Sequence, residues 1–283
     1  MPTDKDFLKN LVGKMLQKIP SKIPGRQRFT RFLTKPIIDN RPALFEANGL
    51  YFCVPSLKEP IAFSLWSSGA YEPEVQELIL SHWKENTWFI DVGANVGAIS
   101  IPLSKLKPGS RVLGIEASPS IFPYLKENVS RNQCENMTIV QCAVCDEEGV
   151  MLDFNEAPES KFGMGSLGTS FGKPSIQVKG HTLDTILADF GTPDVSVMKV
   201  DVEGFESAVF LGAKELLKEQ KPRIIFEFCD WAEENSGRFN IGESQKILRE
   251  AGYEIYLSSS DGIIRLTDVI KGGYENLIAF PRN

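Results

Sequence analysis

The sequence predicts an α/β protein built on a mainly parallel β-sheet with helices on both faces. From Trp88 onward, apolar runs of four to seven residues alternate with helical stretches, as in βαβ units. A glycine-containing turn, DVGANVG (91–97), follows the first of these runs. The composition, with 42% apolar and 24% charged residues, is typical of a soluble protein, and no apolar run reaches the roughly 18 residues that cross a bilayer.

Residues 1–67 are expected to form an N-terminal accessory segment, followed by the main domain at 68–283. The first part of the accessory segment is expected to be an amphipathic helix. Its apolar face holds Phe7, Leu8, Leu11, Val12, Met15, Leu16 and Ile19, and its other face holds Lys9, Lys14 and Lys18. Such a helix can lie on an anionic membrane, dock within the chain, or pair with a second copy in a homodimer. Residues 44–66 are expected to be a short β-rich region with a turn at Asn48-Gly49.

The main domain is expected to begin with a helix over Glu74–Trp83 and to continue as alternating strands and helices. The predicted strands are 88–92, 111–116, 137–144, 195–202, 223–229, 253–258 and 275–281. The predicted helices are 96–105, 119–131, 183–189, 205–219 and 243–251. Residues 155–175, with four glycines and few aliphatic side chains, are expected to be either a functional lid or a disordered loop.

Charge and cysteine content narrow the possible partners and location. Residues 1–36 hold nine Lys or Arg against two Asp, a net charge of +7, so the remainder carries −13. An acidic body repels a phosphate backbone, so we expect no nucleic-acid partner. Five cysteines argue against a disulfide framework, and the first residues lack the features of a signal peptide. We therefore expect a cytoplasmic protein.

The DVGANVG turn is interpreted as a ligand site at the carboxyl end of a strand. Gly93 permits a positive φ and a close ligand approach, whereas Gly97 lets the next helix pack on the sheet. The spacing is not the G-x-G-x-x-G of dinucleotide sites, which disfavours an NAD-dependent oxidoreductase. Asp91 would repel a pyrophosphate but favour an ammonium group, and Glu116 ends the next strand where it can accept ribose hydroxyls. S-adenosylmethionine meets both requirements.

The chain resembles the FkbM-type methyltransferases, a class I S-adenosylmethionine-dependent family. The matching stretches are SGAYEPE (68–74), FIDVGANVGAIS (89–100), GIEASPS (114–120), CAVCDEEG (142–149), HTLDTIL (181–187), MKVDVEGFE (198–206) and IIFEF (224–228). The resemblance implies a Rossmann-like sheet of seven strands whose last pair is antiparallel. It also implies O-methylation of a hydroxyl on a small-molecule acceptor such as a sugar or polyketide, with N-methylating relatives also expected.

The resemblance also assigns cofactor-binding roles to individual positions. The turn residues Asp91, Gly93, Asn95 and Gly97 would cradle the methionine end of the cofactor. Glu116 would hold the ribose, beside Ala117 and Ser118, and Ala143 would pack near the adenine. Glu74 would come from the segment before the first strand and close over the methionine group.

The candidates for catalysis lie in the KVDVE run and near it. Lys199, Asp201 and Glu203 alternate along a strand end, so they point to one side. They form either a structural charge cluster or a site where Asp201 is the general base or orients the acceptor, with Glu203 in support. Asp201 and Glu227 are weak candidates for a Mg²⁺ site, and His181 is a further candidate base. A non-catalytic S-adenosylmethionine-binding protein is the alternative from a different class.

Overall fold

The computed structural model describes residues 4–20, 23, 25–259 and 262–282. Within them, eight strands form one sheet, in the order β12 (Gly262–Arg265), β11 (Tyr253–Ser259), β13 (Tyr274–Pro281), β10 (Arg223–Cys229), β9 (Val195–Val200), β3 (Trp88–Val92), β4 (Arg111–Glu116) and β5 (Met137–Gln141). The five strands from β10 to β5 are parallel, while β13 runs antiparallel to both β10 and β11. The predicted α/β class and antiparallel end are confirmed, but the sheet has eight strands because β12 pairs with β11.

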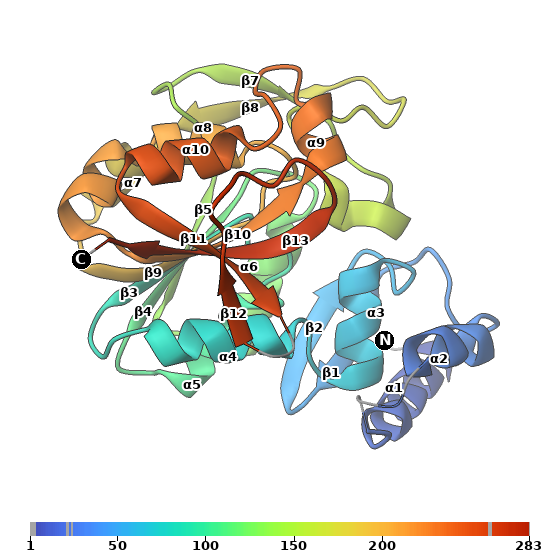
Figure 1. Ribbon diagram of the computed structural model, residues 1–283. Helices are drawn as coiled ribbons and strands as arrows, with labels where there is room; N and C mark the ends of the chain where they lie inside the picture. The colour runs from blue at the N-terminus through green and yellow to red at the C-terminus, as the bar shows by residue number, and fades with distance from the viewer. Residues whose placement is uncertain (1–3, 21–22, 24, 260–261, 283) are drawn as a thin grey trace.

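Both faces of the sheet are buried by helices, which explains why its central strands are buried along almost their whole length and are mostly apolar (Figure 1). Along β3, Phe89 belongs to one hydrophobic cluster and its neighbour Ile90 to the other, as the alternation of a strand requires. The first cluster includes residues of α4 (Pro73–His82), α5 (Ser100–Leu106) and α6 (Phe122–Arg131). The second includes residues of α7 (Leu183–Asp189), α8 (Glu206–Leu211), η2 (Leu216–Gln220) and α10 (Glu243–Glu250). The short α9 (Asp230–Asn235) follows β10.

The N-terminal segment contains α1 (Asp4–Gln17), α2 (Arg26–Thr34), the hairpin β1 (Ala43–Ala47) and β2 (Leu50–Val54), and α3 (Pro60–Ser68). The predicted Asn48-Gly49 turn is confirmed, with φ angles of 47° and 83°. The β-rich prediction for 44–66 is wrong at its end, because Glu59 caps α3 by accepting a bond from Ala62 N at 3.0 Å. The boundary proposed after residue 67 falls inside this helix.

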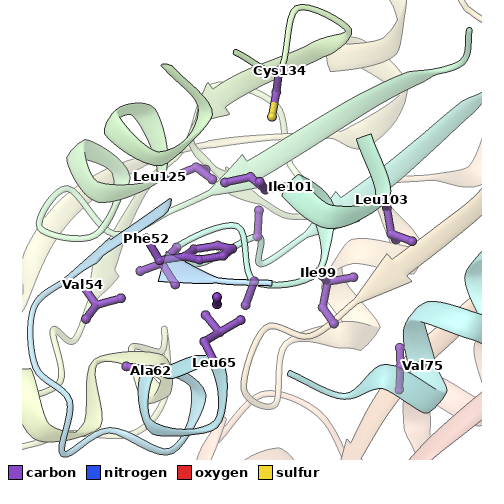
Figure 2. Packing of buried hydrophobic residues seen from close by; sticks show 14 of the residues in the cluster. Phe52, Val54, Ala62, Leu65, Val75, Ile99, Ile101, Leu103, Leu125 and Cys134 are labelled. Carbon is purple, nitrogen blue, oxygen red and sulfur yellow. The ribbon is translucent and has the colours of Figure 1, made fainter. Parts of the chain in front are cut away.

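The hairpin and α3 share a core with the main domain (Figure 2). Phe52, Ala62 and Leu65 lie in the same buried cluster as Ile101 of α5 and Leu125 of α6. Asn128 of α6 also bonds both the N–H and the C=O of Cys53 across this contact. The accessory segment is therefore fixed against the sheet by apolar packing and by hydrogen bonds.

A smaller sheet lies beside the main one, formed by β6 (Ala143–Val144), β8 (Ile176–His181) and β7 (Met151–Phe154). The predicted strand 137–144 is thus split between two sheets. The loop after β7 is ordered: it contains the 3₁₀ helix η1 (Glu159–Met164) and buries Phe162. Among the described residues, no helix combines the length and the apolarity needed to cross a bilayer.

Two predicted helices are shorter than expected because of glycines. Gly97 has a φ of 84°, so α5 starts at Ser100 rather than at residue 96. Gly212 packs against Cys145 O, where an added Cβ would lie only 2.0 Å away, and the predicted helix 205–219 is interrupted there. The predicted helix 119–131 likewise starts late, at Phe122.

Candidate active site

A cavity of about 320 Å³ lies at the carboxyl ends of β3, β4, β9 and β10. Its lining contains most of the predicted site residues: Asp91, Gly93, Asn95, Glu116, Ala117, Ser118, Ala143, Lys199, Asp201, Glu203 and Glu227. The start of α3 and the η1 loop complete the wall. The sheet edge at which parallel strands end is where open α/β folds bind their ligands.

The turn after β3 brings two strand ends into contact. Gly93 has a φ of 83°, and an added Cβ there would lie 1.8 Å from Asp201 O. Asp201 N in turn donates to Val92 O at 3.0 Å. Glycine is therefore required at this position both by backbone conformation and by space.

Asp91 is a buried carboxylate, with 1% of its surface exposed. Neither of its oxygens has a well-formed hydrogen bond within the described part of the chain. Burial raises its pKa, and the nearby Lys199 ammonium and Ser100 hydroxyl offset this only in part. Because a buried acid without a partner is costly, its position at the cavity wall is suited to a cationic ligand group.

Glu116 is held in place by the backbone on both sides. Its two oxygens accept from Asn95 N and Ser118 N, each at 2.8 Å. Burial raises the pKa of Glu116 to about 7, although the two backbone hydrogen bonds act to lower it. A carboxylate oxygen accepts more than one hydrogen bond, so Glu116 can still accept ligand hydroxyls.

Three carboxylates and one ammonium group meet at the ends of β9 and β10. The oxygens of Asp201, Glu203 and Glu227 lie within 4.8 Å of one another, and Lys199 Nζ lies 2.8 Å from Asp201 Oδ2. Burial and the Asp201 charge raise the pKa of Glu203 to about 8, and that of Glu227 well above its usual range. Burial opposes the charge of Lys199, but Asp201 and Asp91 raise its pKa above the ordinary value. The cluster can therefore hold or accept protons near neutral pH.

Glu203 has an unusual backbone for a non-glycine residue, with a φ of 54°. The next residue, Gly204, has a φ of 96°, and an added Cβ would lie 2.3 Å from Ala232 O. Glu206 stabilises this turn by accepting from Val202 N at 3.0 Å. Such strained positions gather at functional sites, where they aim a side chain.

Three site residues escaped the sequence analysis: Tyr71, Glu72 and Tyr274. Tyr71 and Tyr274 line the cavity, and burial followed by nearby carboxylates raises the pKa of both phenols. Glu72 interacts with Lys199 and Asp201, and burial raises its pKa. The YEPE motif contained the signal, but Tyr274 lies in a C-terminal stretch without a motif.

Three predicted residues lie outside the cavity lining: Glu74, His181 and Gly97. Glu74 is exposed in the first turn of α4, because two residues of helix turn it away from Glu72. His181 ends β8 in the smaller sheet, outside the cavity lining, and its Nδ1 lies 2.5 Å from Glu148 Oε1, so the structure does not bring this candidate base to the other site residues. An added Cβ at Gly97 would meet Ile101, which confirms its packing role.

The η1 loop forms one wall of the cavity, with Phe162, Met164 and Leu167. Ser166 Oγ, from the same loop, donates to Glu203 O at 2.9 Å and so ties the wall to the acidic turn. An added Cβ at Gly163 would lie 3.0 Å from both Glu59 and Ile61 at the start of α3. Residues in the 155–168 part of this segment therefore form an ordered wall of the cavity, and their function as a lid stays a prediction.

The acidic cluster offers oxygen ligands of the kind that Mg²⁺ prefers, from Asp201, Glu203 and Glu227. One oxygen of Asp201 is already paired with the Lys199 ammonium, which supplies a positive charge within the cluster. The carboxylate oxygens are thus of a type that suits a divalent ion. The Lys199 ammonium would compete with such an ion for the Asp201 carboxylate.

Comparison with known proteins gives consistent matches. A family model described as "Methyltransferase FkbM domain" matches residues 91–255. "Methyltransferase sdnD" of Sordaria araneosa is 23% identical over 221 residues, covering 67% of this chain and 83% of that protein. The 31-O-demethyl-FK506 methyltransferase FkbM of Streptomyces tacrolimicus is 25% identical over 207 residues, covering 63% and 76%. A solved precorrin-6y C5,15-methyltransferase from Geobacter metallireducens GS-15 is 14% identical, covers 74% and 88%, and has a TM-score of 0.44.

Proposed function

The chain belongs to the FkbM methyltransferase family, and from this premise we propose that it methylates a hydroxyl group of a small metabolite, with S-adenosylmethionine as the donor. One observation carries the proposal. Asp91 and Glu116, which the sequence analysis assigned to opposite ends of the cofactor, line the same cavity. The buried carboxylate of Asp91, which has no well-formed hydrogen bond among the described residues, supports a cationic ligand there, and Glu116 supports a ligand with hydroxyls.

When bound, S-adenosylmethionine supplies a methyl group activated by a positively charged sulfur. Asp91 would accept from the amino group, and Glu116 from the ribose hydroxyls. The backbone bonds of Glu116 fix its orientation before the ligand arrives, which lowers the cost of ordering it on binding. Ala117, Ser118 and Ala143 would contact the adenosine, and the nearby Phe154 offers an apolar surface for the adenine.

The acidic cluster would serve the acceptor. Asp201, fixed by Lys199, would orient the acceptor hydroxyl toward the methyl group. The proton released from that hydroxyl would pass to the carboxylates of the cluster, since a group with a pKa of about 8, such as Glu203, is matched to work near neutral pH. A Mg²⁺ ion, if used, would be held by Asp201, Glu203 and Glu227 and would lower the pKa of the acceptor hydroxyl.

N-methylation is the second candidate. Three carboxylates against one ammonium leave the cluster negative when ionised, which also attracts a cationic amine. The name of the Streptomyces tacrolimicus relative points to oxygen, which is why we prefer a hydroxyl acceptor. The carbon-13 NMR shift of the transferred, isotopically labelled methyl group distinguishes a methyl ether from an N-methyl amine.

Calorimetric titration tests the cofactor. We expect S-adenosylhomocysteine to bind and NAD to show no heat of binding; the reverse result would overturn the proposal. Incubating cell extract with isotopically labelled donor then tests turnover. Binding of S-adenosylhomocysteine without any labelled product across acceptor classes would favour a non-catalytic binding protein.

A further inference from the structure

The helices α1 and α2 lie at the outer end of the N-terminal segment, with β1, β2 and α3 between them and the large sheet (Figure 1). Both helices pack on the rest of the protein through their polar sides. Their larger apolar side chains point the other way, which is the reverse of an ordinary surface helix.

The inner side of α1 is made mostly of polar and small residues. Gly13 packs so closely on Trp66 that an added Cβ would lie 2.5 Å from the indole nitrogen. That indole nitrogen donates to Lys9 O at 2.9 Å, and Gln17 donates to Glu46 O and Trp66 O at 2.9 and 3.0 Å. The Lys9 ammonium, itself buried, pairs with Asp39 at 2.9 Å. Of the predicted apolar face, only Leu16 is fully buried, with Val12 partly so.

The inner side of α2 is polar as well. Its buried residues are Arg26, Thr30 and Thr34. The Arg26 guanidinium donates to Ser68 Oγ at 2.6 Å and to two carbonyls, those of Leu16 and Ser67, at 2.8 and 2.6 Å. The two threonine hydroxyls bond carbonyls of their own helix. The Arg26 bonds join α2 to α1 and α3, and they fix which side of α2 faces inward.

The outward sides form what we call the outer apolar face: Phe7, Leu8, Leu11 and Met15 of α1, and Phe29, Phe32 and Leu33 of α2. All seven are exposed, Phe7 to 71% and Phe32 to 75%. Single exposed apolar side chains are common, but a group of seven on two neighbouring helices is typical of an interaction surface.

Charge identifies the partner. Lys18, Arg28 and Lys35 are exposed on the same two helices or directly after them. Residues 1–36 carry a net charge of +7, of which Lys9 and Lys14 are paired with Asp39 and Glu46, while the rest of the chain carries −13. A symmetric contact between two copies would bring two such basic segments together, at a cost in repulsion. Apolar side chains flanked by Lys and Arg on short amphipathic helices instead match the interface of an anionic bilayer.

We propose that α1 and α2 bind the surface of membranes that contain anionic lipids, with the outer apolar face inserted at the level of the lipid headgroups. The inner polar bonds hold both helices on α3 and the hairpin while the outer face is in the membrane. This attachment does not depend on the reaction proposed above, and it would keep the enzyme at a surface where its acceptor is made or used.

Vesicle flotation with the full chain tests the proposal. We expect binding to phosphatidylcholine vesicles that contain phosphatidylserine, weaker binding to phosphatidylcholine alone, and a loss of binding as salt is raised. The double variant Phe29→Ser/Phe32→Ser should weaken binding by about tenfold or more, because it removes two inserted rings. Its target side chains are exposed, so folding should persist, as unchanged affinity for S-adenosylhomocysteine would verify.

A matched control removes two exposed apolar side chains elsewhere. Leu106→Ser/Met151→Ser, at positions 62% and 55% exposed, should bind vesicles as the wild type does. The proposal is overturned if the wild type does not bind anionic vesicles, or if both double variants bind equally well. It is also overturned if the wild type is a dimer in solution that Phe29→Ser/Phe32→Ser dissociates, because a second copy would then cover the face.

Discussion

Asp91→Asn tests whether the buried acid at the end of β3 serves the ligand or the fold. Asn has nearly the same shape, so the change removes a charge and little else. The Asp91 oxygens have no well-formed bond within the described chain, and Lys199 keeps its 2.8 Å contact with Asp201. Without ligand, the variant should therefore be more stable by about 1–3 kcal/mol, because a neutral amide costs less to bury than a charged carboxylate. The melting temperature should rise by about 2–4 °C for each kcal/mol.

Ligand binding should change in the opposite direction. Loss of a charge-assisted hydrogen bond of about 1.5–3 kcal/mol weakens S-adenosylhomocysteine affinity by roughly 10- to 150-fold. Thermal melting with and without this ligand, together with calorimetric titration, measures both effects on one sample. Greater stability with weaker binding is the signature of a residue placed for a ligand.

A second carboxylate provides the control. Asp184 accepts bonds from Glu215 N and Leu216 N at 2.9 and 3.0 Å and lies outside the cavity lining. Asp184→Asn should destabilise the protein by about 1 kcal/mol and leave the affinity unchanged. If Asp91→Asn also lowers stability and keeps full affinity, Asp91 is a structural partner of Lys199 and does not bind the ligand.

Three further predictions address the acids and the turn. Asp201→Asn should keep the affinity for S-adenosylhomocysteine within about twofold but lower kcat by about 100-fold or more, because it removes either the general base or the group that orients the acceptor. Full turnover in this variant would rule out both roles. Burial raises the pKa of three glutamates, Glu59, Glu116 and Glu206, to about 7. Each of these carboxyl groups therefore holds its proton more tightly in the folded protein than in the unfolded chain, where its pKa is near 4.5. Their contribution to stability is complete below about pH 4.5 and is lost as the pH rises through about 7. The melting temperature of the ligand-free protein should therefore fall between about pH 5 and pH 8. A melting temperature that rises over this range would contradict the raised pKa values. Gly93→Ala and Gly49→Ala share a φ of 83°, but only the first meets Asp201 O, at 1.8 Å. Gly49→Ala should therefore cost about 1–2 kcal/mol of stability and leave binding intact, whereas Gly93→Ala should cost more and abolish binding; equal effects of the two on binding would refute the close contact.

The fold was readable from the sequence wherever local signals agreed with tertiary packing. The mainly apolar runs at 88–92, 111–116 and 223–229 coincide with β3, β4 and β10, because strands buried on both faces are built mostly from apolar residues. The loop after β3 and the acid at the end of β4 were also readable, since consecutive parallel strands end at the same edge of the sheet. For the same reason, the pattern of strands is enough to place Asp201 and Glu227 together.

Other elements were not predictable because long-range contacts decided them. The interruption at Gly212 depends on Cys145, 67 residues earlier in the chain. Tyr274 reaches the cavity only because β13 lies antiparallel to β10. His181 has the chemistry of a base, but its strand joins the smaller sheet, where Glu148 holds it.

The N-terminal helices show most clearly what each level determines. The sequence by itself determined that α1 is amphipathic and that the segment is basic, because periodicity and charge are local properties of the chain. Only the tertiary structure decided which side faces inward: Gly13 admits the Trp66 ring, and Arg26 satisfies carbonyls from α1 and α3. Close packing at a glycine and bonds to buried carbonyls outweigh the burial of a few more apolar side chains, and so the apolar side of both helices faces outward.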